Sequence, residues 1–245
     1  MSPAESIATW IREQVDASGL NGVVLGLSGG IDSATVAGLA ARGLGSDRVL
    51  GVIMPAHSQP GDLKDAQLSA DAFGIETLTI DLSDPYDRLL AILPPGNDMA
   101  NANIKPRLRM ITLYHIANTR GRMVIGTGNR SELMVGYFTK YGDGGVDLLP
   151  LASLYKRDVR AVAREIGVPQ PIIDKPPSAG LWAGQTDENE MGITYEQLDG
   201  VLDALDRGDT SDYPDELVAK VQGMIGRSAH KRRPAPMFVP TGKDA

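Results

Sequence analysis

The segment Gly26-Leu27-Ser28-Gly29-Gly30-Ile31-Asp32-Ser33 joins two adjacent glycines to hydroxyl and carboxylate side chains. Glycine permits backbone angles that other residues resist and lets N–H groups approach an anion closely. The residues that follow favour a helix, whose unpaired N–H groups and dipole would face the same anion. One carboxylate, that of Asp32, is enough to join Mg²⁺ bound to a polyphosphate. This spacing predicts a phosphate-binding loop with a magnesium ligand.

A glycine turn in which Asp32 or Ser33 caps the following helix is the simpler interpretation of the same residues. The coincidence of an apolar run before the turn, a helical pattern after it and the order Ser-Gly-Gly-x-Asp-Ser favours the phosphate loop. It is neither a Walker loop, which needs a Lys after its last Gly, nor a Gly-x-Gly-x-x-Gly turn. It resembles the pyrophosphate loop of the N-type ATP pyrophosphatases, which transfer AMP to a carboxylate or carbonyl and release pyrophosphate.

The elements that must position this loop follow from hydrophobic patterning. Four short apolar runs alternate with amphipathic stretches, a pattern typical of parallel strands joined by crossover helices on both faces of a sheet. The predicted strands are Gly22–Leu27, Val49–Met54, Ile75–Ile80 and Met123–Thr127. The predicted helices in this part of the chain are Ser33–Ala41, stopped by Arg42-Gly43, then Asp62–Phe73, Asn101–Thr119 and Tyr155–Ile166.

The remaining chain changes character. From Pro176 to Asn189 periodicity is lost and Pro, Gly and polar residues dominate, which predicts a mobile loop over 176–189. Helices are expected over Tyr195–Leu205 and Pro214–Arg227, followed by a basic, proline-broken tail that begins at Lys231. The length of 245 residues predicts one domain over 1–245.

Composition excludes several function classes. A net charge of −7 and a pI near 5.0 disfavour nucleic-acid binding, which needs a broad excess of Lys and Arg. The absence of cysteine excludes disulfides, thiolate zinc sites and cysteine nucleophiles. The N-terminus lacks the pattern of a signal peptide, and no apolar run is long enough to span a membrane. A soluble, cytoplasmic protein is expected.

A second group of motifs narrows the family. Gly126-Thr127-Gly128-Asn129-Arg130-Ser131-Glu132 and the stretch from Gly136 to Leu151, with Lys140-Tyr141-Gly142-Asp143-Gly144-Gly145, closely resemble the NAD synthetases. The resemblance continues through Leu154–Arg157, Lys175–Ala179, Gln185–Glu188, Met191–Tyr195 and His230–Arg232, and so covers essentially the whole chain. It implies an α/β fold of the adenine nucleotide α-hydrolase type, with a doubly wound, mostly parallel five-stranded sheet and helices on both faces.

The same resemblance implies roles for individual residues. ATP would contact Gly26, Leu27, Ser28, Gly29, Gly30, Ile31, Asp32, Ser33, Thr127, Lys156 and Ser178; Mg²⁺ would be held by Asp32 and Glu132; and deamido-NAD would contact Arg107, Lys140, Asp147, His230 and Lys231. Asp32 and Lys156 would be the catalytic pair. Physically, Glu132 follows the Met123–Thr127 strand, at the edge where open α/β sheets bind ligands.

Each of these residues also has an ordinary interpretation. Glu132 suits the first turn of a helix, where the dipole favours an acid. Lys140 and Lys156, as isolated lysines, are typical of a solvated surface. Asp143 and Asp147 suit a glycine turn, and His230 a surface position. Two positions depart from the family pattern, namely Pro106 between Lys105 and Arg107, and Gly180, where relatives commonly have an acid.

The resemblance implies ATP-dependent amidation of deamido-NAD through an adenylated carboxylate, usually by a homodimer. Glutamine-using relatives add an amidase domain with a cysteine nucleophile, so a chain of this length without cysteine is expected to use ammonia; a separate glutaminase subunit stays open. The motif Gly128–Ser131 does not settle the nitrogen donor. Alternatives are an adenylating amidotransferase of the GMP synthetase type and a non-catalytic adenine-nucleotide sensor on the same scaffold.

Overall fold

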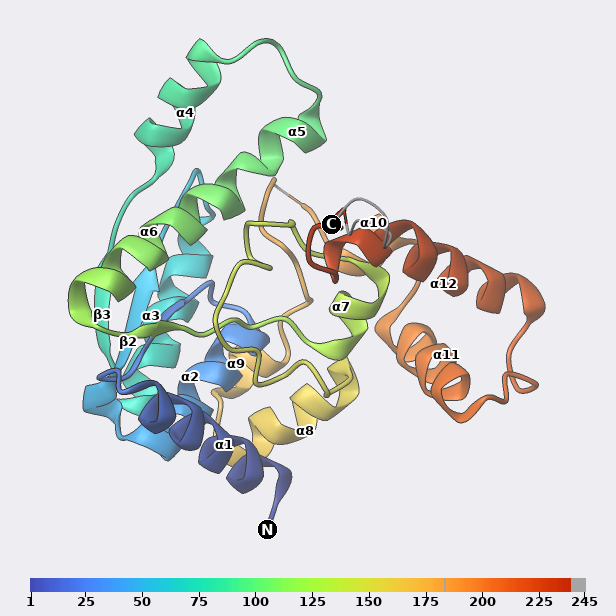
Figure 1. Ribbon diagram of the computed structural model, residues 1–245, viewed down its shortest axis with the longest axis horizontal. Helices are drawn as coiled ribbons and strands as arrows, with labels where there is room; N and C mark the ends of the chain where they lie inside the picture. Colours follow the sequence, from blue (N-terminus) through green and yellow to red (C-terminus); the bar gives the residue numbers. More distant parts are fainter. Residues whose placement is uncertain (183, 239–245) are drawn as a thin grey trace, which may run out of the picture.

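The computed structural model of the protein describes residues 1–182 and 184–238 (Figure 1). The single domain expected over 1–245 therefore includes Ala183 and residues 239–245, which lie outside the described residues. Within the described ranges, none of the helices combines the length and apolar character needed to cross a membrane.

A parallel sheet lies at the centre of the molecule. Its strands are β1 (Val23–Gly26), β2 (Val49–Ile53), β3 (Glu76–Thr79) and β4 (Met123–Val124), in the spatial order β3-β2-β1-β4. All three pairings are parallel, with Val23 opposite both Val49 and Met123. Each strand lies inside one of the four predicted apolar runs, so the strand predictions are confirmed.

The expected count of five strands is wrong for the described residues, which form a four-stranded sheet. After β4, Ile125 pairs with Leu148 only as an isolated parallel bridge, with Gly126 donating its N–H to the Leu148 carbonyl at 2.8 Å. Pro150 follows two residues later and has no N–H to extend the ladder. The fifth strand is thereby reduced to one bridge.

The helices occupy the segments that connect the strands and most of the C-terminal part. In order they are α1 (Pro3–Ser18), α2 (Ile31–Leu44), α3 (Pro60–Phe73), α4 (Ser83–Ile92), α5 (Asp98–Ala102), α6 (Ile104–Arg120), α7 (Arg130–Val135), α8 (Lys156–Ile166), α9 (Gln170–Ile173), α10 (Asp187–Met191), α11 (Tyr195–Arg207) and α12 (Asp215–Ser228), with 3-10 turns at Ser46–Arg48 and Ala229–Lys231.

All six predicted helices are present, with differences at their ends. The stop expected at Arg42-Gly43 is wrong, because α2 continues to Leu44 and ends at Gly45. The helix predicted over Asn101–Thr119 is divided at Asn103 into α5 and α6. Helix α1 is not among the predictions, although Ser2 and Glu5 form a capping box at its start, the usual sequence signature of a helix N-terminus.

Helices cover both faces of the sheet (Figure 1). Alternate residues of β1 face opposite ways: Val23 and Leu25 belong to the core cluster shared with α1, α2 and α8, whereas Val24 belongs to the cluster shared with α6. This alternation is the period-2 geometry of a strand buried on both sides. The predicted doubly wound α/β fold is confirmed.

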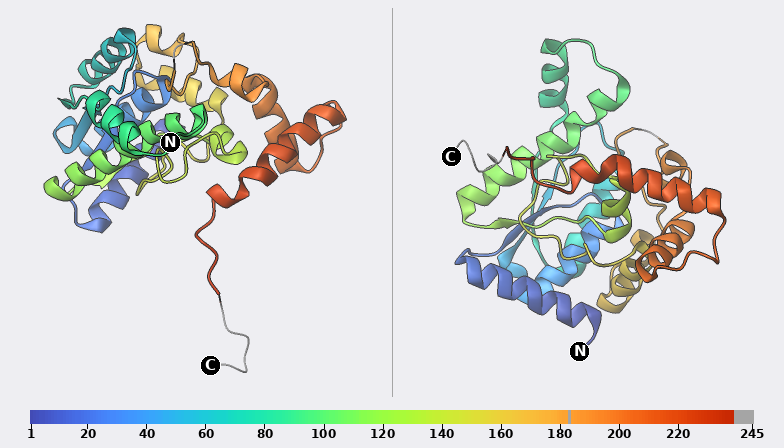
Figure 2. Two further views of the ribbon diagram at one scale, coloured as in Figure 1. Left: turned by 90° about the horizontal axis from the view of Figure 1, so that it is seen from above. Right: turned by 45° about the vertical axis from the view of Figure 1, so that its right-hand side comes forward.

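A second hydrophobic cluster packs the C-terminal helices against α7, which follows the sheet. Helices α11 and α12 form a pair beside α7 (Figure 1), and Tyr195, Leu198 and Val221 are buried in this cluster. Figure 2 shows the described residues after Lys231 leaving the body of the molecule as an extended segment. The basic tail therefore begins where the last 3-10 turn ends.

Candidate active site

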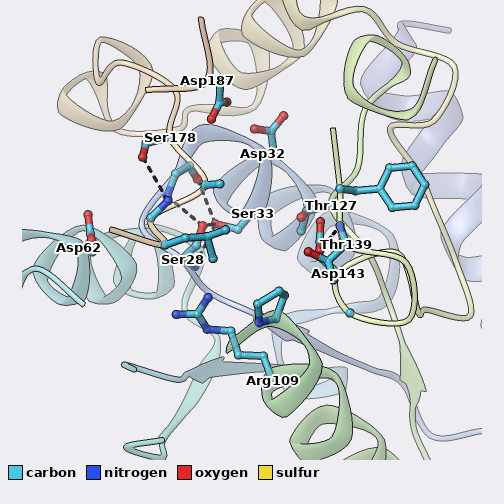
Figure 3. A pocket seen from close by; sticks show the side chains of 18 of the residues that line it. Ser28, Asp32, Ser33, Asp62, Arg109, Thr127, Thr139, Asp143, Ser178 and Asp187 are labelled. Atoms are coloured by element: carbon cyan, nitrogen blue, oxygen red, sulfur yellow. Dashed lines mark hydrogen bonds between the residues drawn. The ribbon is translucent and has the colours of Figure 1, made fainter. Parts of the chain in front are cut away.

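A cavity of about 740 Å³ opens at the carboxyl ends of β1 and β4 (Figure 3). The chain proceeds from β1 outward through β2 and β3 and then returns to the other side of β1 as β4. Ligands bind at such a reversal of strand order, because the connections after the two strands diverge and leave a crevice. Residues Gly26–Ser28 and Gly126–Thr127 line this cavity directly after their strands.

The turn between β1 and α2 depends on glycine at one position. Gly29 has φ +78°, and a Cβ built there would lie 2.4 Å from the carbonyl oxygen of Asp62. Ser28 and Ser33 close the turn from within, with their hydroxyl oxygens 3.1 Å apart and the Ser33 hydroxyl donating to the Gly30 carbonyl at 3.0 Å. The turn is therefore packed tightly against α3 and held by its own hydroxyl groups.

The N-terminus of α2 faces this turn. Its N-cap is Gly30, and within the described chain no side chain caps the helix. The alternative in which Asp32 or Ser33 serves as the N-cap is therefore wrong; both lie in the first turn. An uncapped 14-residue helix presents free N–H groups and the positive end of its dipole, which is the usual environment for a bound phosphate.

Lys156 is the central charged group of the site. Its side chain is 1% exposed, and Nζ lies 2.6 Å from Oδ2 of Asp32 and 3.1 Å from Oε1 of Glu132. Burial lowers the pKa of Lys156, but the negative charges of Asp32 and Glu132 raise it by more. The net shift of the pKa is therefore upward. The lysine is therefore a fixed cation at the start of α8, beside the turn between β1 and α2.

Asn129 joins the two carboxylates to each other. As the N-cap of α7 it forms a capping box with Glu132, accepting from the Glu132 N–H and donating its own N–H to Oε2. Its amide Nδ2 also donates to Oδ1 of Asp32 at 3.0 Å. The ordinary interpretation of Glu132 as a first-turn acid is thus correct locally, and the same acid also contacts Lys156.

Burial raises the pKa of Glu132 to about 7, and the neighbouring carboxylates of Asp32 and Asp187 add to the rise while Lys156 opposes it. Since the folded-state pKa exceeds the ordinary value, the folded protein binds more protons than the unfolded chain between about pH 4.5 and 7. The free energy of unfolding contributed by this group therefore falls as the pH rises through that window.

Replacing Glu132 with glutamine should make that fall shallower, by up to about 1.4 kcal/mol per pH unit, because one titrating group is removed. Urea unfolding of both proteins at half-unit steps from pH 4.5 to 7.5 measures the slope. Glu165→Gln, an exposed position on α8, is the matched control and should leave the slope unchanged. Equal slopes for wild type and Glu132→Gln would contradict the assignment.

The oxygen atoms of Asp32 and Glu132 suit a hard cation. Both side chains retain some exposure, 19% and 15%, and both line the cavity. Among the described residues, no group of three or more His, Cys, Asp or Glu side chains is arranged to hold a metal ion. Magnesium bound to a polyphosphate usually takes only one or two protein carboxylates, so this donor set fits Mg²⁺ carried in with phosphate.

The residues expected to contact ATP lie together. Ten of the eleven line the described cavity: Gly26, Leu27, Ser28, Gly30, Ile31, Asp32, Ser33, Thr127, Lys156 and Ser178. Gly29 supplies the turn beneath them. Figure 3 shows Ser28, Ser33, Asp32 and Ser178 around one side of the cavity, with Thr127 on the other side.

The residues expected to contact the dinucleotide are more dispersed. Of these five, only Lys231 is among the described cavity-lining residues, where it donates to the carbonyls of Gly136 and Phe138. Arg107 donates to the Lys140 carbonyl at 3.3 Å, and Lys140 donates to the His230 carbonyl at 2.8 Å. These three residues thus form a connected group outside the cavity.

Asp147 lies apart from that group. Its two carboxylate oxygens accept from the Tyr114 hydroxyl at 2.9 Å and from the Val124 N–H at 2.8 Å. The contact with Val124 secures the turn after Gly145 to the end of β4. In the described chain Asp147 therefore has a local structural role beside the sheet, and its contact with a dinucleotide stays a prediction.

Several cavity residues were missed by sequence reasoning. Arg109 donates to the Met54 carbonyl, Lys175 is paired with Asp62 and Asp65 at 2.8 and 2.6 Å, and Asp187 lies near Asp32 (Figure 3). Asp187 stands within the motif Gln185–Glu188 and Lys175 within Lys175–Ala179, so the motifs contained them without indicating a role. Arg109 had no such signal beyond its place on a predicted helix.

The segment 176–189, expected to be mobile, forms one wall of the cavity. Lys105 donates to the Leu181 carbonyl at 2.8 Å, and the Asp187 N–H donates to the Pro177 carbonyl at 3.1 Å. Gly180 has φ +61°, which suits glycine better than the acid common in relatives. Pro106 is buried and also lines the cavity. Mobility of this segment stays a prediction, and Ala183 lies outside the described residues.

Comparison with known proteins places this geometry in a family. The family model described as NAD synthase matches residues 4–235. The NH₃-dependent NAD⁺ synthetase of Archaeoglobus fulgidus is 50% identical over 235 residues, covering 95% of this chain and 94% of that protein.

Two solved structures are similar over nearly the whole chain. NMN synthetase from Francisella tularensis aligns with a TM-score of 0.90 at 38% identity, covering 97% of this chain and 99% of that one. The NH₃-dependent NAD synthetase from Campylobacter jejuni, solved in complex with nitrate, aligns with a TM-score of 0.84 at 30% identity, covering 97% and 98%.

Proposed function

The chain belongs to the NAD synthase family, and from this premise we propose that it amidates deamido-NAD to NAD with ATP and ammonia. It is a ligase that uses ATP as co-substrate and forms a carbon–nitrogen bond. The observation that supports this reaction most directly is the buried contact of Lys156 with Asp32 and Glu132 beside an uncapped helix N-terminus. Such a site can hold a nucleoside triphosphate and stabilise charge on its phosphates.

In the first step, a carboxylate oxygen of the nicotinate group attacks the α-phosphorus of ATP. The bond from that phosphorus to the oxygen bridging it to the β-phosphate breaks, and pyrophosphate leaves. The free N–H groups of α2 and the Lys156 ammonium neutralise negative charge that grows on the phosphate oxygens. Positioning is the larger task, because the site must bring two anions together that otherwise repel each other.

In the second step, ammonia attacks the carboxyl carbon of the adenylated nicotinate, the bond from that carbon to the AMP oxygen breaks, and the nitrogen loses a proton to leave the amide. No covalent bond to the protein is required. Segment 176–189, which already forms one wall of the cavity, would shield the adenylate from water when it closes over the nucleotide.

The charge of the cavity supports a magnesium requirement. Six acidic side chains line its described part, namely Asp32, Asp62, Glu132, Asp143, Asp187 and Glu190, against four basic ones, Arg109, Lys156, Lys175 and Lys231. A wall with more acids than bases does not by itself attract two anionic nucleotides. We therefore propose that Asp32 and Glu132 hold Mg²⁺, which would supply the missing positive charge on the phosphates.

Three of the residues expected to contact deamido-NAD lie where a second copy of the chain could contact them. Arg107, Lys140 and His230 are linked to one another on the surface outside the cavity. We propose that they meet deamido-NAD across the interface of a homodimer, in which each cavity is completed by the partner. The single domain over 1–245 and the cytoplasmic location stay predictions.

Purified protein should form NAD from deamido-NAD, ATP, Mg²⁺ and ammonium, with AMP and pyrophosphate released in equal amounts. Glutamine free of ammonium should not replace ammonium, and equal rates with the two donors would refute ammonia as the direct donor. Because the Francisella tularensis neighbour is an NMN synthetase, the acid form of NMN is assayed in parallel. A kcat/KM higher for that mononucleotide than for deamido-NAD would show that the mononucleotide is the preferred substrate.

The same assay separates the other rivals. An amidotransferase of the GMP synthetase type would release pyrophosphate with a purine nucleotide in place of deamido-NAD. A nucleotide sensor would bind ATP without turnover. Pyrophosphate release that depends on deamido-NAD supports the proposed reaction against both.

A further inference from the structure

Two side chains that the proposed mechanism does not use, those of Tyr195 and Asp187, lie at the wall of the cavity; Asp187 is part of the described lining and Tyr195 is not. Tyr195 begins α11 and Asp187 begins α10, and both are buried, with 1% and 4% exposure. The Tyr195 hydroxyl lies 2.9 Å from Oδ2 of Asp187 and 3.2 Å from Oε1 of Glu132. One phenol therefore connects the end of segment 176–189 to the carboxylate that faces Lys156.

The contacts of Tyr195 and Lys156 converge on a single atom. Oε1 of Glu132 accepts from Lys156 Nζ and shares the single proton of the Tyr195 hydroxyl with Oδ2 of Asp187. The centre of the Tyr195 ring lies 4.9 Å from the same Nζ. The last torsion of a glutamate side chain is broad, so its carboxylate takes a definite orientation only where donors fix it. Here the phenol and the ammonium fix one oxygen, and the Asn129 N–H contacts the other.

One carboxylate oxygen of Asp187 is buried without a hydrogen-bond partner in the described part of the chain. This oxygen is Oδ1, whereas Oδ2 accepts from Tyr195. A buried polar atom without a partner costs free energy and is rare in folded proteins. Leucine or asparagine would cost less if packing were the only requirement, so the carboxylate at this place calls for a functional explanation.

We propose that Tyr195 and Asp187 form a positioning pair that holds the Glu132 carboxylate against Lys156 before ATP arrives. The hydroxyl lies between the two carboxylates and shares its one proton with both, which fixes the position of Glu132 relative to Asp187. The N–H of Asp187 donates to the Pro177 carbonyl and connects this arrangement to the base of segment 176–189. The inference rests on the proposed adenylation reaction. Because Tyr195 lies outside the described cavity lining and acts through Glu132, its loss should affect the rate of the step more than ATP binding.

The test is Tyr195→Phe, which keeps the ring over Lys156 and removes only the hydroxyl. We expect kcat for NAD formation to fall roughly 10- to 100-fold while KM for ATP changes less than about twofold. The matched control is Tyr213→Phe, another phenol packed in the same hydrophobic cluster but outside the described cavity lining, with kcat unchanged. Affinity for ATP, titrated without deamido-NAD, should match wild type in both variants. The Tm of Tyr195→Phe should fall because two buried carboxylates lose a donor, so far-UV circular dichroism at the assay temperature must show that the variant is folded.

Asp187→Asn keeps the size of the side chain and one acceptor oxygen, so its loss of kcat should be smaller than that of Tyr195→Phe. If the two residues act as a pair, the double variant falls no further than Tyr195→Phe alone. Three outcomes would overturn the proposal. The first is a double variant whose loss of kcat equals the product of the two single losses. The others are an unchanged kcat in Tyr195→Phe and a rise in KM for ATP with kcat unchanged. Failure of the wild type to form NAD would instead reject the proposed function.

Discussion

Lys156→Met is expected to lower kcat for NAD formation by roughly 10²- to 10³-fold, the usual cost of removing a fixed group that stabilises charge in the transition state. Methionine keeps much of the length of the side chain but removes the ammonium that lies 2.6 Å from Asp32 and 3.1 Å from Glu132. Rates of pyrophosphate release with saturating deamido-NAD and ammonium measure the loss.

The same change should destabilise the fold, because two neighbouring carboxylates lose their shared cation. Removing one partner of a buried ion pair costs about 3–5 kcal/mol, and the lower end applies here since Asp32 and Glu132 keep some contact with solvent. Mg²⁺ added without nucleotide should raise the Tm of Lys156→Met more than that of wild type, because the ammonium no longer occupies the space between the carboxylates.

Lys64→Met on α3 is the matched control, since Lys64 is exposed and lies outside the described cavity lining. It should leave both kcat and the free energy of unfolding unchanged. Activity of Lys156→Met within about tenfold of wild type would contradict the electrostatic role of this lysine.

Asp32→Asn should abolish measurable release of pyrophosphate. Asparagine fills the same space, and its carbonyl oxygen can still accept from Asn129 Nδ2, but the negative charge that pairs with Lys156 and suits Mg²⁺ is lost. Lys156 keeps Glu132 as its partner, so the fold should survive. The Tm and the far-UV circular dichroism spectrum distinguish loss of chemistry from loss of structure.

Asp71→Asn on α3 is the control for this change, because Asp71 is exposed and accepts from Gln67 through an oxygen that asparagine retains. It should turn over like wild type. Turnover of Asp32→Asn at the wild-type rate would remove Asp32 from the metal site and leave its ion pair with Lys156 as a purely structural contact.

Local pattern was enough to predict the strands, most of the helices and the glycine turn between β1 and α2. Apolar runs of strand length and glycines at a strand-to-helix junction are properties of neighbouring residues, so the turn at Gly29 and a helix after it follow from the order of the chain, although α2 begins at Ile31 and not at the predicted Ser33. The missing fifth strand shows the limit of this reasoning. Whether Leu148 extends the sheet depends on how far the chain can run beside β4 before Pro150.

The grouping of the site residues depends on the tertiary structure. Lys156 is an isolated lysine in the sequence, with the surface as its ordinary place; only the packing of α8 against α2 buries it beside Asp32, 124 positions away. Tyr195 reaches Glu132 for the same reason, because the C-terminal helices pack beside α7.

By itself, then, the sequence determined the α/β order of elements, the glycine turn before α2 and, through its motifs, the family. The tertiary structure decided which charges meet. Hydrogen bonds within turns and helices join residues close in sequence and leave a readable pattern, whereas an ion pair across 124 positions forms only when the whole chain folds. That is why the turn around Gly29 could be predicted from its neighbours, whereas local pattern gave no sign that Lys156 contacts Asp32 and Glu132, and only the family resemblance grouped these residues.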